Sequence, residues 1–147
     1  MLLPALEHVT IHCADLAASV NFYGEYLGLK AGFRPPVDPP GVWLYAEGAK
    51  TAMVHLLQLD IQSKIAQATS TGKFDHFNLR MTGLPAYLAK LKASKGWYTA
   101  IPLMEGLSQV QHLDPSGVMV EVSFFGESIA PADVVLTALE DYVAVAG

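Results

Sequence analysis

The sequence predicts an α+β protein built from two copies of one strand–helix–strand–strand–strand module, followed by a C-terminal helix. One observation is a repeated segment, because residues 6–13 and residues 74–81 each place an acid and a histidine before a strand-like run that leads into a helix-like stretch. The other is a second potential metal ligand late in each half, His55 or Glu121. We therefore expect two paired modules whose sheets form one curved mixed sheet around a cleft.

The first module, about residues 5–58, begins with a strand over residues 6–13, in which apolar and polar residues alternate. Asp15 is a suitable N-cap for the helix that follows, and Gly28 supplies its C-terminal stop. Further strands are expected at residues 29–34, 42–47 and 51–58, with the last two forming a hairpin around Gly48.

A connector over residues 59–73 separates the modules, and the second module covers about residues 74–125. Its expected elements are a strand at 74–81, a helix at 84–94, and strands at 97–102, 108–113 and 118–125. The segment Asp114-Pro115-Ser116-Gly117 is a strong turn signal between the last two strands. Apolar residues at helical spacing predict a terminal helix over about residues 131–146, and the whole chain, 1–147, reads as one domain.

Composition limits the classes of function. Of the 147 residues, 52% are apolar and 16% are charged, which favours a compact globule over a disordered chain. The net charge of −5 argues against a general nucleic-acid binder. We see no signal peptide and no apolar run long enough to span a bilayer, so we expect a cytoplasmic protein without membrane or nucleic-acid partners. The single cysteine, Cys13, excludes an internal disulfide framework and reads as a buried thiol.

Four side chains form the candidate metal site. If the faces that carry His8, His55, His76 and Glu121 all line the cleft, three imidazoles and one carboxylate converge there. This donor set suits Zn, Ni, Fe(II), Co or Mn. Each histidine taken alone is more simply explained as a structural or surface residue, and the paired arrangement favours the metal site.

Glu121 lies in an otherwise apolar strand, where an ionised carboxylate is costly without a partner. A metal ion is one such partner. Arg80 is another, although its guanidinium could instead bind an anionic substrate.

At these residues the sequence resembles the vicinal oxygen chelate superfamily, which includes glyoxalase I, bleomycin-resistance and fosfomycin-resistance proteins, methylmalonyl-CoA epimerase and extradiol dioxygenases. The resemblance is carried by the following elements: Leu6-Glu7-His8-Val9, Asp15-Leu16 with Ser19, Phe22-Tyr23 with Leu27-Gly28-Leu29, Asp75-His76, and Asp114-Pro115-Ser116-Gly117 with Glu121. It implies paired βαβββ modules and a divalent metal held by His8, His76 and Glu121, with His55 at the fourth position. It also implies a small-molecule substrate and a homodimer.

The chemistry common to that superfamily is chelation of a substrate by two neighbouring oxygens, so we expect a glyoxalase-like lyase, isomerase or epimerase that moves a proton next to a carbonyl. Glu121, the only carboxylate in the set, is the expected catalytic base. An iron(II) extradiol-type dioxygenase is an alternative, although Gln111 stands where those enzymes carry a tyrosine. A non-catalytic, bleomycin-resistance-type binding protein is another.

Other polar and aromatic residues are candidates for contacts with the substrate. His12 stands where glyoxalase I usually has an arginine that contacts glutathione, which places a glutathione-derived substrate in doubt. The candidate substrate-binding residues are His12, Arg80, Trp43 and Tyr45, although aromatic residues in strands are more often part of the core. We interpret His112, which alternation turns away from Gln111, as structural.

Overall fold

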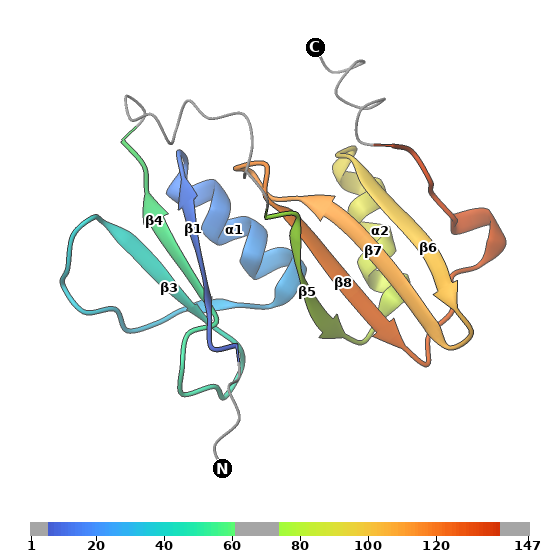
Figure 1. Ribbon diagram of the computed structural model, residues 1–147, viewed down its shortest axis with the longest axis horizontal. Helices are drawn as coiled ribbons and strands as arrows, with labels where there is room; N and C mark the ends of the chain where they lie inside the picture. Colours follow the sequence, from blue (N-terminus) through green and yellow to red (C-terminus); the bar gives the residue numbers. More distant parts are fainter. Residues whose placement is uncertain (1–5, 61–73, 139–147) are drawn as a thin grey trace. The chain divides into compact units, whose positions relative to one another are not determined.

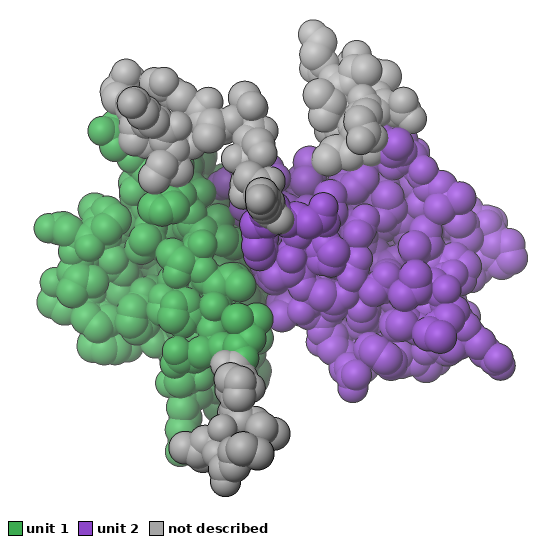
Figure 2. Space-filling view, viewed as in Figure 1, with its two compact units in different colours: residues 1–70 green, residues 71–147 purple. Residues whose placement is uncertain are grey.

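The computed structural model describes residues 6–60 and 74–138. The chain divides into two compact units, residues 1–70 and residues 71–147 (Figure 2). Each unit contains a four-stranded mixed sheet and one long helix in the predicted strand–helix–strand–strand–strand order (Figure 1). No helix in the described part of the chain is both long and apolar enough to cross a membrane.

Unit 1 contains β1 (Val9–Cys13), α1 (Leu16–Leu27), β2 (Lys30–Ala31), β3 (Gly41–Tyr45) and β4 (Val54–Gln58). The sheet order is β1-β4-β3-β2; β1 runs parallel to β4 and the other pairs are antiparallel. The side chain of Asp15 caps α1 by accepting the Ala18 N–H at 2.8 Å, and Gly28 ends the helix in the left-handed region at a φ of 67°. Tyr23, Leu44 and Leu56 are fully buried in the core of this unit.

Unit 2 contains β5 (His76–Met81), α2 (Leu84–Ser94), β6 (Tyr98–Met104), β7 (Leu107–Leu113) and β8 (Met119–Phe125). Its sheet order, β5-β8-β7-β6, repeats the topology of unit 1, with β5 parallel to β8. Along α2, the buried residues follow helical spacing at Leu84, Tyr87, Leu88 and Leu91. The Tyr87 ring packs edge-on against Phe124, so β8 presents this side of the sheet to the helix.

The predicted elements of the two modules are confirmed with shifted boundaries. The second helix has the predicted bounds, and Asp114 forms the predicted turn by accepting the N–H groups of Ser116 and Val118, both at 2.8 Å. The strand predicted at residues 29–34 is reduced to two residues, because the segment that follows runs into the proline-rich loop. Most of the predicted connector, residues 61–73, lies outside the described residues.

The predicted terminal helix over residues 131–146 is wrong where the structure describes it. Residues Pro131–Asp133 form one 3₁₀ turn, and Val135 then forms an antiparallel bridge with Ala100, in which both N–H···O distances are 2.9 Å. The backbone groups of β6, the last strand in the sheet order, offer pairing partners that β-branched valines accept readily. The remainder of the prediction, residues 139–146, lies outside the described residues.

Candidate active site

The polar face of unit 2 is the sheet face opposite α2. Strand register places Asn78 beside Glu121 on one side and Gln111 beside Glu121 on the other, so β5, β8 and β7 bring these side chains to the same face. The intervening residues, Val120 and Val122, are fully buried on the helix side. The alternation expected from the sequence therefore positions a carboxylate among carboxamides.

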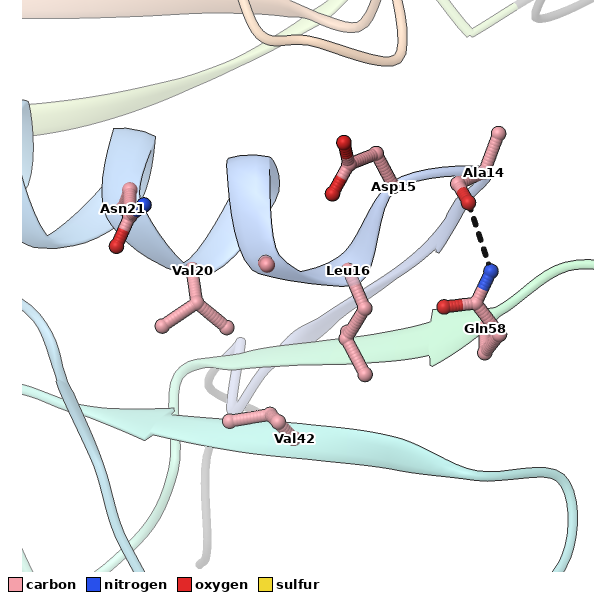
Figure 3. A pocket seen from close by; sticks show the side chains of 8 residues that line it. Ala14, Asp15, Leu16, Val20, Asn21, Val42 and Gln58 are labelled. Carbon is pink, nitrogen blue, oxygen red and sulfur yellow. Dashed lines mark hydrogen bonds between the residues drawn. The ribbon is translucent and has the colours of Figure 1, made fainter.

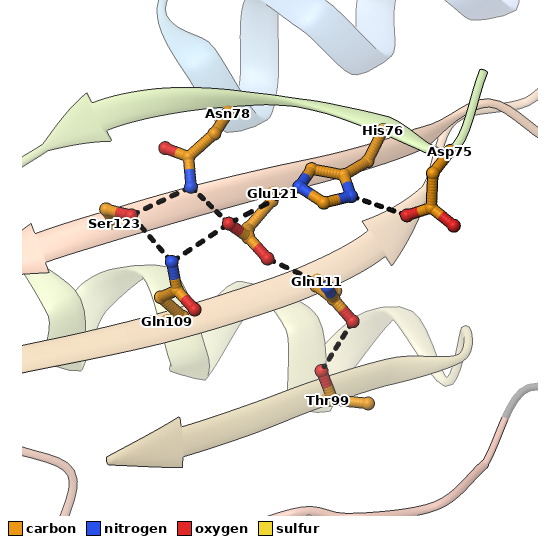
Figure 4. Close-up of polar contacts among 8 residues, drawn as sticks. All are labelled: Asp75, His76, Asn78, Thr99, Gln109, Gln111, Glu121 and Ser123. Carbon is orange, nitrogen blue, oxygen red and sulfur yellow. Dashed lines mark hydrogen bonds and ion pairs between the residues drawn. The ribbon is translucent and has the colours of Figure 1, made fainter. Parts of the chain in front are cut away.

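Glu121 is only 6% exposed, and three carboxamides donate hydrogen bonds to it (Figure 4). Oε1 accepts from Gln109 Nε2 at 2.9 Å and also from Asn78 Nδ2, while Oε2 accepts from Gln111 Nε2 at 2.8 Å. We call Asn78, Gln109 and Gln111 the carboxamide cradle. Its N–H groups replace the water that a buried carboxylate loses, so Glu121 has polar partners within its own unit.

Sequence reasoning missed Gln109 as a partner of the carboxylate. The available signal was spacing, because Gln109 and Gln111 are two residues apart in one strand and must therefore share a face. The alternative prediction, that the Arg80 guanidinium pairs with the Glu121 carboxylate, is wrong. The Arg80 guanidinium carbon lies 3.9 Å from the centre of the Phe125 ring, and the cradle satisfies the carboxylate instead.

His76 lies at the start of β5, half-buried, with both ring nitrogens directed at acids. Nδ1 is 2.6 Å from Asp75 Oδ1, and Nε2 is 3.6 Å from Glu121 Oε1 (Figure 4). A carboxylate that accepts the Nδ1 proton fixes the tautomer and leaves the Nε2 lone pair available. The pair of Nε2 and the Glu121 carboxylate is the half of the candidate metal set that unit 2 supplies.

Unit 1 supplies the other half, and its histidines are stacked. The rings of His8 and His55 lie 3.9 Å apart between centres at an angle of 15°, and the rings of Trp43 and His55 lie 4.1 Å apart at 6°. Cross-strand register explains the stack, since Trp43 is the partner of His55 in the β3–β4 pair. Burial is the main cause that lowers the pKa of His55, and the charge of His8 lowers it further while that of Glu7 raises it.

The remaining predicted substrate contacts lie on strands β1 and β3. His12 is exposed in β1, and the Tyr45 hydroxyl donates to the Phe33 carbonyl at 2.7 Å. Within either unit taken by itself, the described residues gather no three His, Cys, Asp or Glu side chains around one metal position. The four-residue metal set, which draws on both units, therefore stays a prediction.

His112 is structural, as predicted. It faces α2, where its Nε2 lies 2.7 Å from the Tyr87 hydroxyl, and it is 2% exposed. Burial lowers the pKa of His112 from 6.5 to about 4, so the ring is neutral at physiological pH. The site chemistry does not use this histidine.

A separate hollow of about 650 Å³ lies in unit 1, between the start of α1 and the sheet (Figure 3). Because Val42 is adjacent to Trp43 in β3, it points to the opposite face from the histidine stack. The hollow is therefore distinct from the predicted metal site. It is lined by Ala14, Asp15, Leu16, Ala17, Val20, Asn21, Val42 and Gln58, and the Gln58 amide donates to the Ala14 carbonyl at 2.8 Å.

Comparison with known families is decisive for the fold and the superfamily. The family described as the Glyoxalase/Bleomycin resistance protein/Dioxygenase superfamily matches residues 5–122. The chain belongs to this superfamily. It is 30% identical over 125 residues to "Glyoxylase I 4" of Arabidopsis thaliana, a match that covers 82% of this chain and 70% of the plant protein.

Solved structures show the same fold at low sequence identity. The fosfomycin resistance protein FosX of Listeria monocytogenes matches with a TM-score of 0.64 and 11% identity, covering 91% of this chain and 100% of FosX. A mutant of FosX was solved with Mn(II) and a dihydroxypropylphosphonic acid. TnmS3, an antibiotic binding protein from Streptomyces sp. CB03234, matches with a TM-score of 0.61 and 17% identity, covering 85% of this chain and 98% of TnmS3.

Proposed function

We propose that this chain is a glyoxalase-like, divalent-metal-dependent enzyme that transfers a proton next to the carbonyl of a small oxygen-chelating substrate. The observation that carries the proposal is the position of Glu121: a buried carboxylate on the polar face of unit 2, with His76 Nε2 3.6 Å away. The similarity to the plant protein named as a glyoxylase supports this reaction class.

The donor chemistry fits a divalent metal. His8, His76 and Glu121 are the proposed ligands; His76 already has its second ring nitrogen fixed by Asp75, as is common for ligating histidines. A divalent ion bound there would polarise the substrate carbonyl and stabilise an enolate-like oxyanion. This chemistry accords with the Mn(II) complex of FosX.

In the proposed reaction Glu121 accepts the proton from the carbon next to the carbonyl and returns it to a neighbouring atom of the same substrate, so the step is a balanced isomerisation. The carboxamide cradle holds the carboxylate in place during both transfers. Among the described residues, Gln109 and Asn78 both donate to Oε1 and Gln111 alone donates to Oε2, so Oε2 has the greater remaining capacity to accept the proton.

A second candidate function is non-catalytic binding of a small molecule. One specific observation favours it: the cradle satisfies Glu121 without a metal ion, so the buried charge alone does not require one. TnmS3, whose fold is similar, is an antibiotic binding protein. The two functions differ in metal affinity and in turnover.

The test begins with the metal content of the purified chain and its affinity for added Ni, Zn, Mn and Fe(II). Hemithioacetals, α-oxo thioesters and catechols are then screened, with oxygen uptake recorded for the catechols. Glu121→Gln should nearly abolish turnover and retain the fold, whereas Glu105→Gln, a change at an exposed residue between β6 and β7, should have no effect. Full activity of Glu121→Gln would refute the base assignment, and a chain that binds none of these metals would favour the binding protein.

A further inference from the structure

The ring geometry in unit 1 decides which of its two histidines can bind the proposed metal. Imidazole binds a metal through a nitrogen lone pair that lies in the plane of the ring. Two imidazoles can therefore share one ion only if their ring planes intersect at that ion. The planes of His8 and His55 are instead nearly parallel, at 15°, with ring centres 3.9 Å apart.

An ion bound to His8 would lie about 2.1 Å from its ring nitrogen and close to the plane of that ring. Because the two ring planes are nearly parallel and the ring centres are 3.9 Å apart, this ion would lie outside the plane of the His55 ring. No lone pair of His55 points toward such a position. The observed arrangement therefore allows only one of the two histidines to bind that ion.

Both faces of the His55 ring are covered. His8 covers one face, and Trp43 covers the other at 4.1 Å and 6°. Rotating His55 toward an ion would break both contacts, whereas His8 has one ring contact among the described residues, the one with His55. His8 also lies beside Glu7 Oε2, which is 3.4 Å from its Nδ1, an arrangement that matches the His76–Asp75 pair in unit 2.

We infer that His55 is not a metal ligand: together with Trp43 it forms an aromatic clamp that fixes the ring plane of His8, and the metal set narrows to His8, His76 and Glu121. This inference rests on the proposed function. In it, His55 and Trp43 are positioning residues that act through His8. Three protein ligands leave enough coordination positions for both oxygens of a chelating substrate.

Metal affinity of single variants tests the clamp, with Mn(II) measured by electron paramagnetic resonance and Zn by competition with a chromogenic chelator. His55→Phe keeps an aromatic ring and removes both nitrogens, so its affinity should stay within about threefold of the wild type. His55→Ala and Trp43→Leu remove stacking, and each should weaken binding about 10- to 100-fold, the range expected when a support of a ligand is lost. His8→Phe should abolish specific binding.

Two outcomes would overturn the clamp. One is a loss of affinity in His55→Phe as large as that in His8→Phe, which would make His55 a ligand. The other is unchanged affinity in both His55→Ala and Trp43→Leu, because a positioning role requires a loss there. Circular dichroism of every variant shows whether its fold is retained.

A measurement on the metal-free chain tests the aromatic clamp independently of the proposed metal-dependent function. In the metal-free chain, proton NMR should show the ring protons of His8 and His55 shifted upfield by their stacked neighbours, and the shift of His55 should largely disappear in Trp43→Leu. A wild-type chain that binds no metal refutes the proposed function. The absence of the upfield shifts refutes the clamp, whatever the result for the metal.

Discussion

Acidification should destabilise the folded chain through His112. Burial lowers the pKa of this histidine from 6.5 to about 4, so between these values the unfolded chain binds a proton that the folded chain does not. Stability therefore falls as the pH drops through this window and levels off below the folded pKa. The linkage relation gives a loss of about 2 kcal/mol at pH 5 and about 3 kcal/mol near pH 4.

The variant His112→Gln isolates this effect, because an amide can still bond the Tyr87 hydroxyl but does not titrate. Urea unfolding is followed by the fluorescence of Trp97, which is buried in unit 2, in a Trp43→Phe background and with a chelator present. Between pH 7 and pH 5 the chain with His112 should lose about 2 kcal/mol more than the Gln variant.

A second variant distinguishes the cause of the shift. Tyr87→Phe removes the hydrogen bond at 2.7 Å but keeps the burial that lowers the pKa of His112. It should lower stability at every pH and retain the same acid-dependent loss. If the free energy of unfolding fell equally with pH in the chain with His112 and in His112→Gln, titration of His112 would not be the cause of the acid-dependent loss.

Two further predictions concern the sheets. Gly41→Ala would bring a Cβ atom into a steric clash with the Leu56 carbonyl oxygen, so thermal unfolding should show a loss of about 1–3 kcal/mol; an unchanged melting temperature would contradict this packing. Gln109→Leu removes one hydrogen bond to Glu121 at 2.9 Å and should cost about 1–2 kcal/mol in urea unfolding. A double-mutant cycle with Glu121→Ala, which removes the acceptor, should give a coupling of about 1 kcal/mol, and the absence of coupling would show that the two side chains do not interact.

Periodicity and turn residues were sufficient to predict the repeated module. The alternation around Glu121 and the Asp114 turn come from local rules that depend on few residues, and the structure confirms both. The partner of Glu121 depends instead on cross-strand register, which the local pattern of one strand does not fix. Gln111 lies opposite Glu121 because β7 pairs with β8 in that register, and Arg80, two residues beyond Asn78, lies over Phe125.

The predicted terminal helix is a case in which a local pattern predicted the wrong element. Val134 and Val135 fit a helical pattern of apolar residues, but β-branched side chains also suit a strand, and tertiary pairing with Ala100 outweighed the pattern. The stacking of His8 on His55 could not be predicted from the sequence pattern either. Strand alternation places the two rings on one face but does not fix the angle between their planes. Convergence of the two units on one metal stays a prediction.

The bridge between Val135 and Ala100 has a consequence for solubility. A long outermost strand with open backbone donors and acceptors is a template on which identical chains can add to one another. In unit 2 the backbone of Val135 occupies both groups of Ala100 in β6, one of the two edge strands of that sheet. In unit 1 one of the two edge strands, β2, has only two residues. The short segment after Pro131 therefore leaves less of the β6 backbone open for pairing with another chain, a role independent of any chemistry at Glu121.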